Sequence, residues 1–334
     1  MIEAKEAARN ALDCVFDAIR GEQLLILCDE DRLELARAFA DGALELGLLV
    51  KIVTLKTTTV RTKIDENLRL ELTLQKPDIY LNLMRGIREE TPFRIEIIKL
   101  QTRGKVARLA HCPGITLEML TEGSLALSRE EHLKMQSLAS RSLQALVSAN
   151  EVKLTSPSGT DLKVSVRGRR WFTDVKFDWE LWKWINLPTG EVIVAPIESS
   201  LEGRLVCDLA VGGIGVIRTL VEITAKHGKV QSVSCRDRAL ADKIKDTLAT
   251  DDWSNVIGEL AFSINPKAKL EGEFLEAEKI RGTAHIAFGN NDDYPGGMNR
   301  SRNHMDFLMS KPTLEVGLED GTKITLLKDG RFLI

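Results

Sequence analysis

The sequence predicts an α/β protein of two domains. The first is a layered N-terminal domain with a parallel sheet over residues 1–150, and the second is a C-terminal domain over residues 151–334, rich in mixed or antiparallel sheet. The chain has 334 residues, which is long for one ordinary domain and ample for a hydrophobic core. Up to residue 150, short apolar runs alternate with amphipathic helical segments. Beyond it, the apolar pattern changes to a two-residue period, which is typical of strands.

Composition and charge exclude several classes of function. A hydrophobic content of 43% and a charged content of 28% are those of a soluble globular protein. The net charge of −3 offers no electrostatic basis for binding nucleic acid or anionic lipid. No apolar run approaches the roughly 20 residues of a membrane helix, and the first 19 residues contain no signal-peptide core. The five cysteines are scattered and form no C-x-x-C motif, so we expect a cytoplasmic protein that binds neither nucleic acid nor membrane.

The N-terminal half contains a β-α-β unit. Residues 23–28 form an apolar run, residues 32–46 carry apolar side chains at helical spacing, and residues 48–55 are again strand-like. Further strands are predicted at residues 78–83 and 106–110, and Thr91-Pro92 marks a helix start. We therefore expect a parallel sheet with helices.

Nucleotide binding by this half is not expected. The turn after the first strand reads CDEDR, which lacks G-x-G-x-x-G and places three acidic groups where a pyrophosphate would lie. The later GGIG, residues 212–215, follows an apolar strand and favours a hairpin turn over a phosphate loop. The half is better suited to frame a substrate cleft or a subunit contact.

A long helix over residues 128–149 is predicted to bridge the domains. Ser128 and Glu131 form a capping box at its start. His132 follows two glutamates in the first turn, so we expect it to be solvated rather than to bind a ligand.

The C-terminal half begins with a predicted hairpin, residues 152–156 and 161–166, joined by a Pro-Ser-Gly turn. Residues 186–196 are predicted to form a turn that leads into a strand beginning at Glu191. The two-residue pattern continues through most of the half, with further strands predicted at residues 204–211, 216–223, 230–234 and 257–266 and a helix at 239–249. This pattern predicts a mixed or antiparallel sheet, with a curl toward a barrel as one possible arrangement.

Residues 281–306, RGTAHIAFGNNDDYPGGMNRSRNHMD, contain the strongest functional signal. If the stretch from Asn303 is extended, His304 and Asp306 share one face and offer a nitrogen and an oxygen to a divalent metal. AHIAFG reads as a second strand that brings His285 against them. An isolated H-x-D is common, and a histidine on an apolar strand is more often a core residue. Two histidines and an aspartate around one Gly/Asn loop favour a metal site.

Two glutamates upstream extend this set. Glu191 heads the apolar strand in GEVIVAP, and Glu259 has the same setting in GELAFS. Each could lie at an exposed strand end, but a buried carboxylate must be paired or bound to metal. Together with Tyr294 and the three residues above they make six candidate ligands, more than one tetrahedral zinc needs. We therefore favour a dinuclear centre with two divalent metals per chain, such as Zn, Co or Mn.

Five stretches resemble the aminopeptidase T and aminopeptidase S group of metallopeptidases, the M29 family: GTDLKVSVRGRRW, NLPTGEVIVAP, IGELAFSINP, EKIRGTAHIAFG and SRNHMD. The resemblance covers most of the C-terminal half. It implies an N-terminal α/β domain, a C-terminal metal domain and a homodimer enclosing its active sites. The metal ligands it implies are Glu191, Glu259, His285, His304 and Asp306. Tyr294 departs from the pattern, because NNDD lengthens its distance from the first histidine.

We therefore expect a metallo-aminopeptidase that removes N-terminal residues from peptides by means of a metal-activated water. Glu259 or Glu191 is the candidate proton carrier, and Tyr294 is a candidate for stabilising the oxyanion or completing a metal shell. Asn290, Arg300 and Arg302 are possible substrate contacts.

Two other functions stay open. A related branch of the same fold contains a dihydroxypyridine ring-cleaving dioxygenase with a single Fe(II), and His285, His304 and Asp306 could supply its ligands. The third possibility is a non-catalytic protein that binds a metal or a small molecule on a peptidase scaffold.

Overall fold

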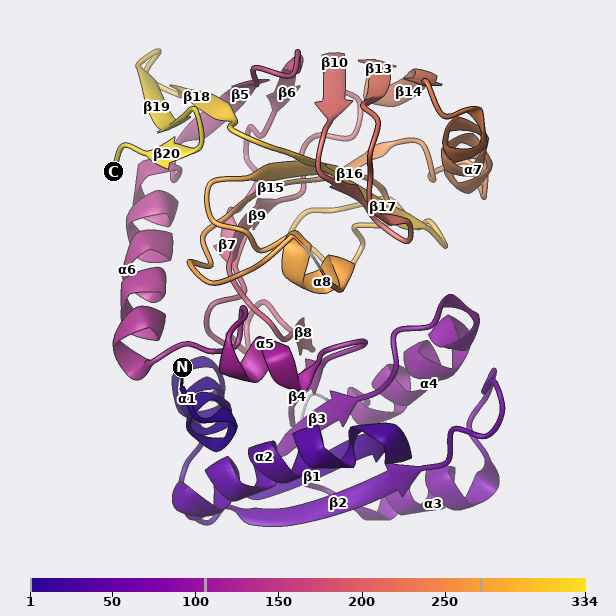
Figure 1. Cartoon of the computed structure of the whole chain (residues 1–334). Helices are drawn as coiled ribbons and strands as arrows, with labels where there is room; N and C mark the ends of the chain where they lie inside the picture. Colours follow the sequence, from indigo (N-terminus) through magenta and orange to yellow (C-terminus); the bar gives the residue numbers. More distant parts are fainter. Residues whose placement is uncertain (1, 105–106, 271) are drawn as a thin grey trace. The chain divides into compact units, whose positions relative to one another are not determined.

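The computed structural model describes residues 2–104, 107–270 and 272–334. The chain divides into two compact units (Figure 1). The first comprises residues 1–136 and 174–189, and the second comprises residues 137–173 and 190–334. These bounds differ from a single boundary at residue 150, because the division falls within a helix and one later segment returns to the first unit.

The first unit is built on a parallel sheet of five strands in the order β2-β1-β3-β4-β8. Its strands are β1 Gln23–Asp29, β2 Leu49–Leu55, β3 Ile79–Leu83, β4 Arg108–His111 and β8 Ile185–Asn186. Its helices are α1 Ala4–Phe16, η1 Glu30–Arg32, α2 Leu33–Glu45, α3 Glu66–Leu74, η2 Arg88–Glu90, α4 Thr91–Gln101 and α5 Leu117–Thr121. The predicted β-α-β unit is confirmed, since β1 and β2 pair in parallel. The predicted strand at 106–110 begins at Arg108, and Val106 lies outside the described residues.

Helices pack on both faces of this sheet. Leu25 and Leu27 of β1 lie in one buried cluster with Leu68 of α3 and Phe93 of α4. Successive side chains of a strand alternate between faces, so the intervening residues of β1 point to the opposite face. There α2 contacts β1 and β2 and packs against α1.

Where β1 ends, a buried group of charges fills the turn that sequence analysis excluded as a nucleotide site. Asp29 is fully buried and pairs with Arg61. Arg61 also pairs with Glu90, and so does Arg85, which follows β3. The acidic turn therefore binds guanidinium groups of its own chain.

The helix α6, Arg129–Ala145, begins in the first unit, and the division between the units falls within it, between Gln136 and Ser137. Its capping box is confirmed: the Ser128 amide donates to Glu131 at 2.8 Å, and the Glu131 amide donates to the Ser128 hydroxyl at 3.2 Å. The expectation that His132 is solvated is wrong, because the side chain is buried. The position falls on the inner face of the helix, which the neighbouring glutamates do not reveal.

The second unit contains two antiparallel sheets. The larger has the order β14-β13-β10-β6-β5-β18-β19-β20. Its strands are β5 Ala149–Thr155, β6 Asp161–Ser165, β10 Glu202–Cys207, β13 Val221–Lys226, β14 Lys229–Cys235, β18 Thr313–Leu318, β19 Lys323–Lys328 and β20 Arg331–Phe332. The predicted hairpin of β5 and β6 is confirmed by their antiparallel register.

The other sheet carries the candidate site and has the order β12-β11-β17-β16-β15-β9-β7. Its strands are β7 Phe172–Thr173, β9 Glu191–Val194, β11 Ala210–Val211, β12 Gly215–Val216, β15 Ile257–Ser263, β16 Ala284–Gly289 and β17 His304–Met309. The helices of this unit are α7 Arg238–Leu248 and α8 Phe274–Ala277, besides the end of α6. GGIG joins β11 to β12 as a hairpin turn, as predicted. In neither of these two sheets do the first and last described strands pair, so neither closes into a barrel.

Candidate metal centre

Four neighbouring strands carry the predicted ligands. Glu191 begins β9, Glu259 lies in β15, His285 lies in β16, and β17 begins with His304 and contains Asp306. Each of these strands is antiparallel to the next. Residues opposite one another in such a sheet project from the same face, and so do residues two apart in one strand.

The register puts two carboxylates in one row across three strands. Glu259 lies opposite Ala287, and Ala287 lies opposite Asp306. The central position of the row is thus occupied by a methyl group, which leaves space between the two acids. His304 is two residues before Asp306 and therefore projects from the same face.

The same alternation places the other two candidates. Ala261 lies opposite His285, and Ser263 lies opposite Glu191. Both Ala261 and Ser263 are an even number of residues from Glu259. All five predicted ligands therefore project from one face of the sheet, beside small residues that do not cover them.

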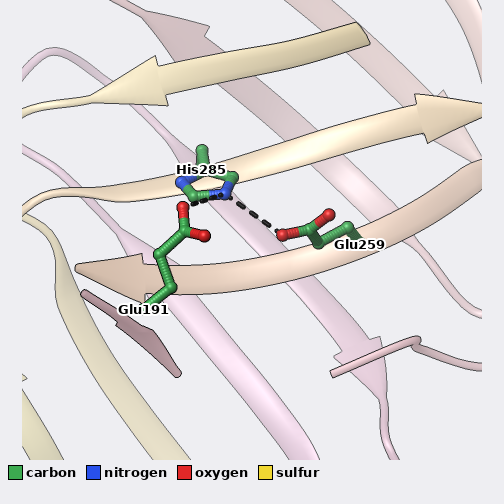
Figure 2. Close-up of side chains that lie close together, drawn as sticks. All are labelled: Glu191, Glu259 and His285. Carbon is green, nitrogen blue, oxygen red and sulfur yellow. Dashed lines mark hydrogen bonds and ion pairs between the residues drawn. The ribbon is translucent and has the colours of Figure 1, made fainter. Parts of the chain in front are cut away.

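The side chains meet at hydrogen-bonding distance. The imidazole of His285 lies between two carboxylates, with its Nε2 3.4 Å from Glu191 Oε1 and 3.2 Å from Glu259 Oε1 (Figure 2). On the other side, Nε2 of His304 lies 3.2 Å from Glu259 Oε2 and 3.2 Å from Asp306 Oδ1. Two groups of possible metal-binding atoms result, each within 4.8 Å, and Glu259 belongs to both.

The two glutamates do not lie at exposed strand ends. Glu191 is 4% exposed and Glu259 is 2% exposed, although each lies at or near the start of its strand. The continuation of the sheet on either side, rather than the position in the strand, buries them.

Tyr294 also reaches the site despite its longer spacing from His285. Its hydroxyl donates to Glu259 Oε2 at 2.8 Å, and its ring packs edge-on against Phe172 with centroids 5.2 Å apart. The extra residues in the loop between β16 and β17 are accommodated by a compact turn.

Buried asparagines hold that loop in place. The Asn291 side chain donates to the Gly258 carbonyl at 3.0 Å, and the Asn299 side chain donates to the Ile257 carbonyl at 2.8 Å. The backbone N–H of Asn299 also donates to Oδ1 of Asn291 at 2.8 Å. The loop returns tightly at Gly289, where φ is +115° and an added Cβ would lie 2.1 Å from the Asn303 carbonyl oxygen.

An ion pair on the second unit supports the same loop. Arg169 Nη2 lies 2.6 Å from Glu198 Oε2, and the two side chains are 10% and 9% exposed. The other oxygen of Glu198 accepts from the Met298 amide at 3.0 Å, and Arg169 donates to the Gly296 carbonyl. Sequence analysis did not select this pair, because neither residue belongs to a motif with a chemical role.

Lys279 is a residue of the site that sequence analysis missed. It is 3% exposed and binds Glu191 Oε2, while Glu278 Oε1 lies 2.9 Å from its ammonium group. In LEAEKIRG a lysine beside glutamates is typical of a solvated surface, so the local charge pattern gives no sign that Lys279 is buried. The possible substrate contact Arg302 is instead 79% exposed and lies 3.8 Å from Asp251.

The buried carboxylates of the site raise the pKa values of the histidines beside them. Burial alone would lower the pKa of His285, but the hydrogen bond with Glu259 and the charges of Glu191, Glu259 and Asp306 raise it to about 9. The same balance raises the pKa of His304 well above its usual value. Burial, reinforced by Glu259, raises the pKa of the Tyr294 hydroxyl, which therefore stays protonated. Protonated imidazoles supply the positive charge between the acids.

The donor set fits divalent metals. Carboxylate oxygens and imidazole nitrogens are the ligands of Zn, Co and Mn. The backbone carbonyl of Asn290 lies 2.8 Å from His304 Nδ1, so Nδ1–H can donate there and leave Nε2 directed at Glu259 and Asp306. Among the residues that the structure describes, no such group contains His285 together with His304 and Asp306.

Comparison with known proteins agrees with this geometry. A family model described as thermophilic metalloprotease (M29) matches residues 127–332. The chain belongs to this family. The match covers the whole metal centre and leaves most of the first unit outside it.

A sequence relative and two solved structures extend the comparison. Aminopeptidase T of Thermus aquaticus is 32% identical over 169 residues, which are 45% of this chain and only 40% of that protein. Wild-type AmpT of Thermus thermophilus has a TM-score of 0.70 at 19% identity, covering 99% of both chains. The 2,5-dihydroxypyridine dioxygenase of Pseudomonas putida KT2440 has a TM-score of 0.69 at 15% identity, covering 99% of this chain and 96% of that one. The two structures establish the mixed α/β fold but do not distinguish the two chemistries.

Among the described residues, no helix is both long and apolar enough to span a bilayer.

Proposed function

We propose that this M29 protein is a metallo-aminopeptidase with a dinuclear centre. One observation carries the proposal: the two oxygens of Glu259 face two different imidazoles, and each imidazole has a further carboxylate beside it. Such an arrangement offers two cation positions that share one bridging carboxylate. The name of the T. aquaticus relative, aminopeptidase T, supports the same class of reaction.

We assign Glu191, Glu259 and His285 to one metal position, and Glu259, His304 and Asp306 to the other. When bound, two divalent ions such as Zn, Co or Mn would polarise the scissile carbonyl and lower the pKa of a water molecule toward neutrality. The side chains hold this geometry before a metal arrives, because each is fixed by a strand of one sheet.

The chain's own groups supply the remaining chemistry. Tyr294 is held protonated by burial, so its hydroxyl can donate a hydrogen bond to an oxyanion that forms beside Glu259. A carboxylate must take a proton from the attacking water and return it to the leaving amine. Glu259 and Glu191 are the candidates for this role. Glu259 already accepts from Tyr294 and faces two imidazoles, which favours a ligand role for it.

The substrate we propose is a peptide with a free N-terminal amine, bound by a cytoplasmic homodimer. All five proposed ligands lie in the second unit. Size-exclusion chromatography with light scattering tests the dimer.

Metal analysis combined with a peptidase assay tests the function. Purified protein should hold about two divalent metals per chain and release the first residue of a free peptide but not of its N-acetylated form. Glu191→Gln should retain roughly one metal. Glu315→Gln, an exposed glutamate of β18, is the matched control and should behave as wild type. Release of residues from both peptides alike would contradict aminopeptidase action.

The alternative is a mononuclear Fe(II) dioxygenase that uses His285, His304 and Asp306. The likeness to the P. putida dioxygenase fold favours keeping it. It requires one iron per chain, consumption of oxygen with a dihydroxypyridine, and tolerance of Glu191→Gln. An oxygen electrode with iron-loaded protein separates the two reactions.

A further inference from the structure

The two halves of the site differ in charge because of Lys279. Its ammonium group binds Glu191 Oε2 and lies 2.9 Å from Glu278 Oε1, and its side chain is 4% exposed. This contact leaves Glu191 Oε1, the oxygen beside His285, to face a metal. Glu191 can therefore bind a metal through Oε1, while the Lys279 ammonium group on Oε2 compensates part of the carboxylate charge.

Within the part of the chain that the structure describes, neither Glu259 nor Asp306 forms an ion pair with a lysine or an arginine. Glu259 and Asp306 both face His304 Nε2, and the ion pairs described for them are made with the two histidines of the site. A metal at this position therefore meets two carboxylates whose described ion pairs are with histidines alone. Lys279 lies closer to Glu191 than to Glu278, so its positive charge weakens the attraction of Glu191 for a cation.

Access to solvent differs in the same direction. The side chains of His304 and Asp306 are 31% and 10% exposed, whereas those of His285 and Glu191 are 1% and 5% exposed. Desolvation of an incoming ion is therefore less costly on the His304 side.

We propose that Lys279 makes the Glu191–His285 half the weaker metal position, so that the centre fills in order, first at His304 and Asp306 and then at His285 and Glu191. Lys279 is a positioning residue in this proposal, because it acts on the metal through Glu191. Loading of the second position, and with it the population of the complete dinuclear centre, then depends on the metal concentration. This inference rests on the dinuclear centre proposed above.

Calorimetric titration of the apoprotein with zinc tests the order of loading. Wild type should bind in two steps of unequal affinity. Lys279→Met should tighten the weaker step by about ten-fold, because a buried positive charge beside the incoming dication is removed. The stronger step should change less than threefold. Lys279→Arg retains the charge and should keep the weak step weak, and Lys226→Met, on the exposed face of β13, is the matched surface control.

Three further variants keep the test decisive if the single Met substitution prevents folding, as circular dichroism would show. Glu278→Gln removes the carboxylate beside the Lys279 ammonium, so the less compensated positive charge should loosen the weak step, and a weak step that tightens instead would contradict the role of Lys279. His285→Ala should retain the strong step, and His304→Ala should lose it. Loss of the strong step in His285→Ala, or a weak step that loosens or stays within threefold in Lys279→Met, would overturn the inference. A wild type that binds only one zinc would instead contradict the dinuclear centre itself.

Discussion

At the scale of single residues, the site depends on Glu259. Its two oxygens contact His285, His304 and Tyr294, and it is the one carboxylate common to both groups of ligands. Burial would raise the pKa of this carboxyl, but its hydrogen bonds to the two histidines hold the pKa well below its usual range. The residue is therefore an anion throughout the physiological pH range and can bridge two cations.

Replacing Tyr294 separates catalysis from metal binding. Tyr294→Phe retains the ring that packs on Phe172 and removes only the hydroxyl. We expect an unchanged metal content and a fall in kcat of about 10- to 100-fold, because one donor to a developing oxyanion is lost. Steady-state kinetics and elemental analysis of the same preparation measure both. Loss of metal from this variant would show that the hydroxyl belongs to the metal shell instead.

The sequence predicts which residues form the site better than it predicts how they are held. The H-x-D pattern, the His285 strand and the two Gly-Glu strands identify all five proposed ligands, because each ligand is a polar or charged residue in an otherwise apolar strand. Lys279 was missed because its neighbours Glu276 and Glu278 give it the appearance of a surface residue. His132 was misjudged for the same reason. The charges of neighbouring residues do not show whether a side chain is buried by segments that are distant in the sequence.

At the scale of secondary-structure elements, the antiparallel sheet converts spacing into geometry. Strands β9, β15, β16 and β17 are neighbours, so residues separated by more than a hundred positions project from one face. Apolar runs predict β9, β15 and β16, and the spacing of His304 and Asp306 favours an extended β17, but pairing between distant strands such as β11 and β17 is not encoded locally. The order of the strands therefore had to come from the structure.

The loop between β16 and β17 provides a test at this scale. Glu198→Gln breaks the nearly buried pair with Arg169 and weakens the contact with the Met298 amide. We expect a loss of about 3 kcal/mol in the free energy of unfolding, because one charge of a buried pair is left without its partner. Chemical denaturation followed by fluorescence measures it, with the exposed Glu202 of β10 replaced by Gln as the control. A loss below about 0.5 kcal/mol, the ordinary effect of a surface substitution, would contradict the role of the pair.

The charge cluster of the first unit predicts a dependence of stability on pH. Burial would raise the pKa of Glu90, but hydrogen bonds from Arg61 and Arg85 outweigh it and lower the pKa from 4.5 to about 2. A lowered pKa in the folded state stabilises the fold above the unfolded pKa, and this contribution is lost as the pH falls toward the folded value. Glu90→Gln should therefore be less stable than wild type at pH 7 by roughly 2–3 kcal/mol.

The difference in the free energy of unfolding between wild type and Glu90→Gln should become smaller as the pH falls from 4.5 to about 2. Urea denaturation at a series of pH values follows it, wherever both proteins remain folded. A difference that stays constant across this interval would show that the carboxyl does not titrate with the lowered pKa.

At the scale of the whole molecule, the chain consists of two units with separate cores. The change from helical spacing to a two-residue period in the apolar pattern predicts one unit with a parallel sheet and helices and another rich in antiparallel sheet. It does not predict that residues 174–189 belong to the first unit, because the pairing that places them there is the short parallel contact of β8 with β4. Two residues, Ile185 and Asn186, are too few to give a recognisable strand pattern.

Removal of metal should affect the units differently. The proposed ligands all lie in the second unit, and a ligand that binds only the folded state stabilises the part that binds it. We expect chelation to accelerate amide hydrogen exchange in β9, β15, β16 and β17 and to leave β1 and β3 unchanged. Exchange followed by mass spectrometry resolves these segments. Equal acceleration in both units would indicate that the metal acts on the whole chain.

The most direct test of the account is the metal content of wild type and of Glu259→Gln, measured by elemental analysis after loading with zinc and desalting. The account predicts about two metals per chain in wild type and fewer than about half of one in the variant, because the bridging carboxylate serves both positions. It also predicts that kcat/KM for a free peptide falls at least about 100-fold in the variant. One metal per chain in both proteins would contradict the shared centre.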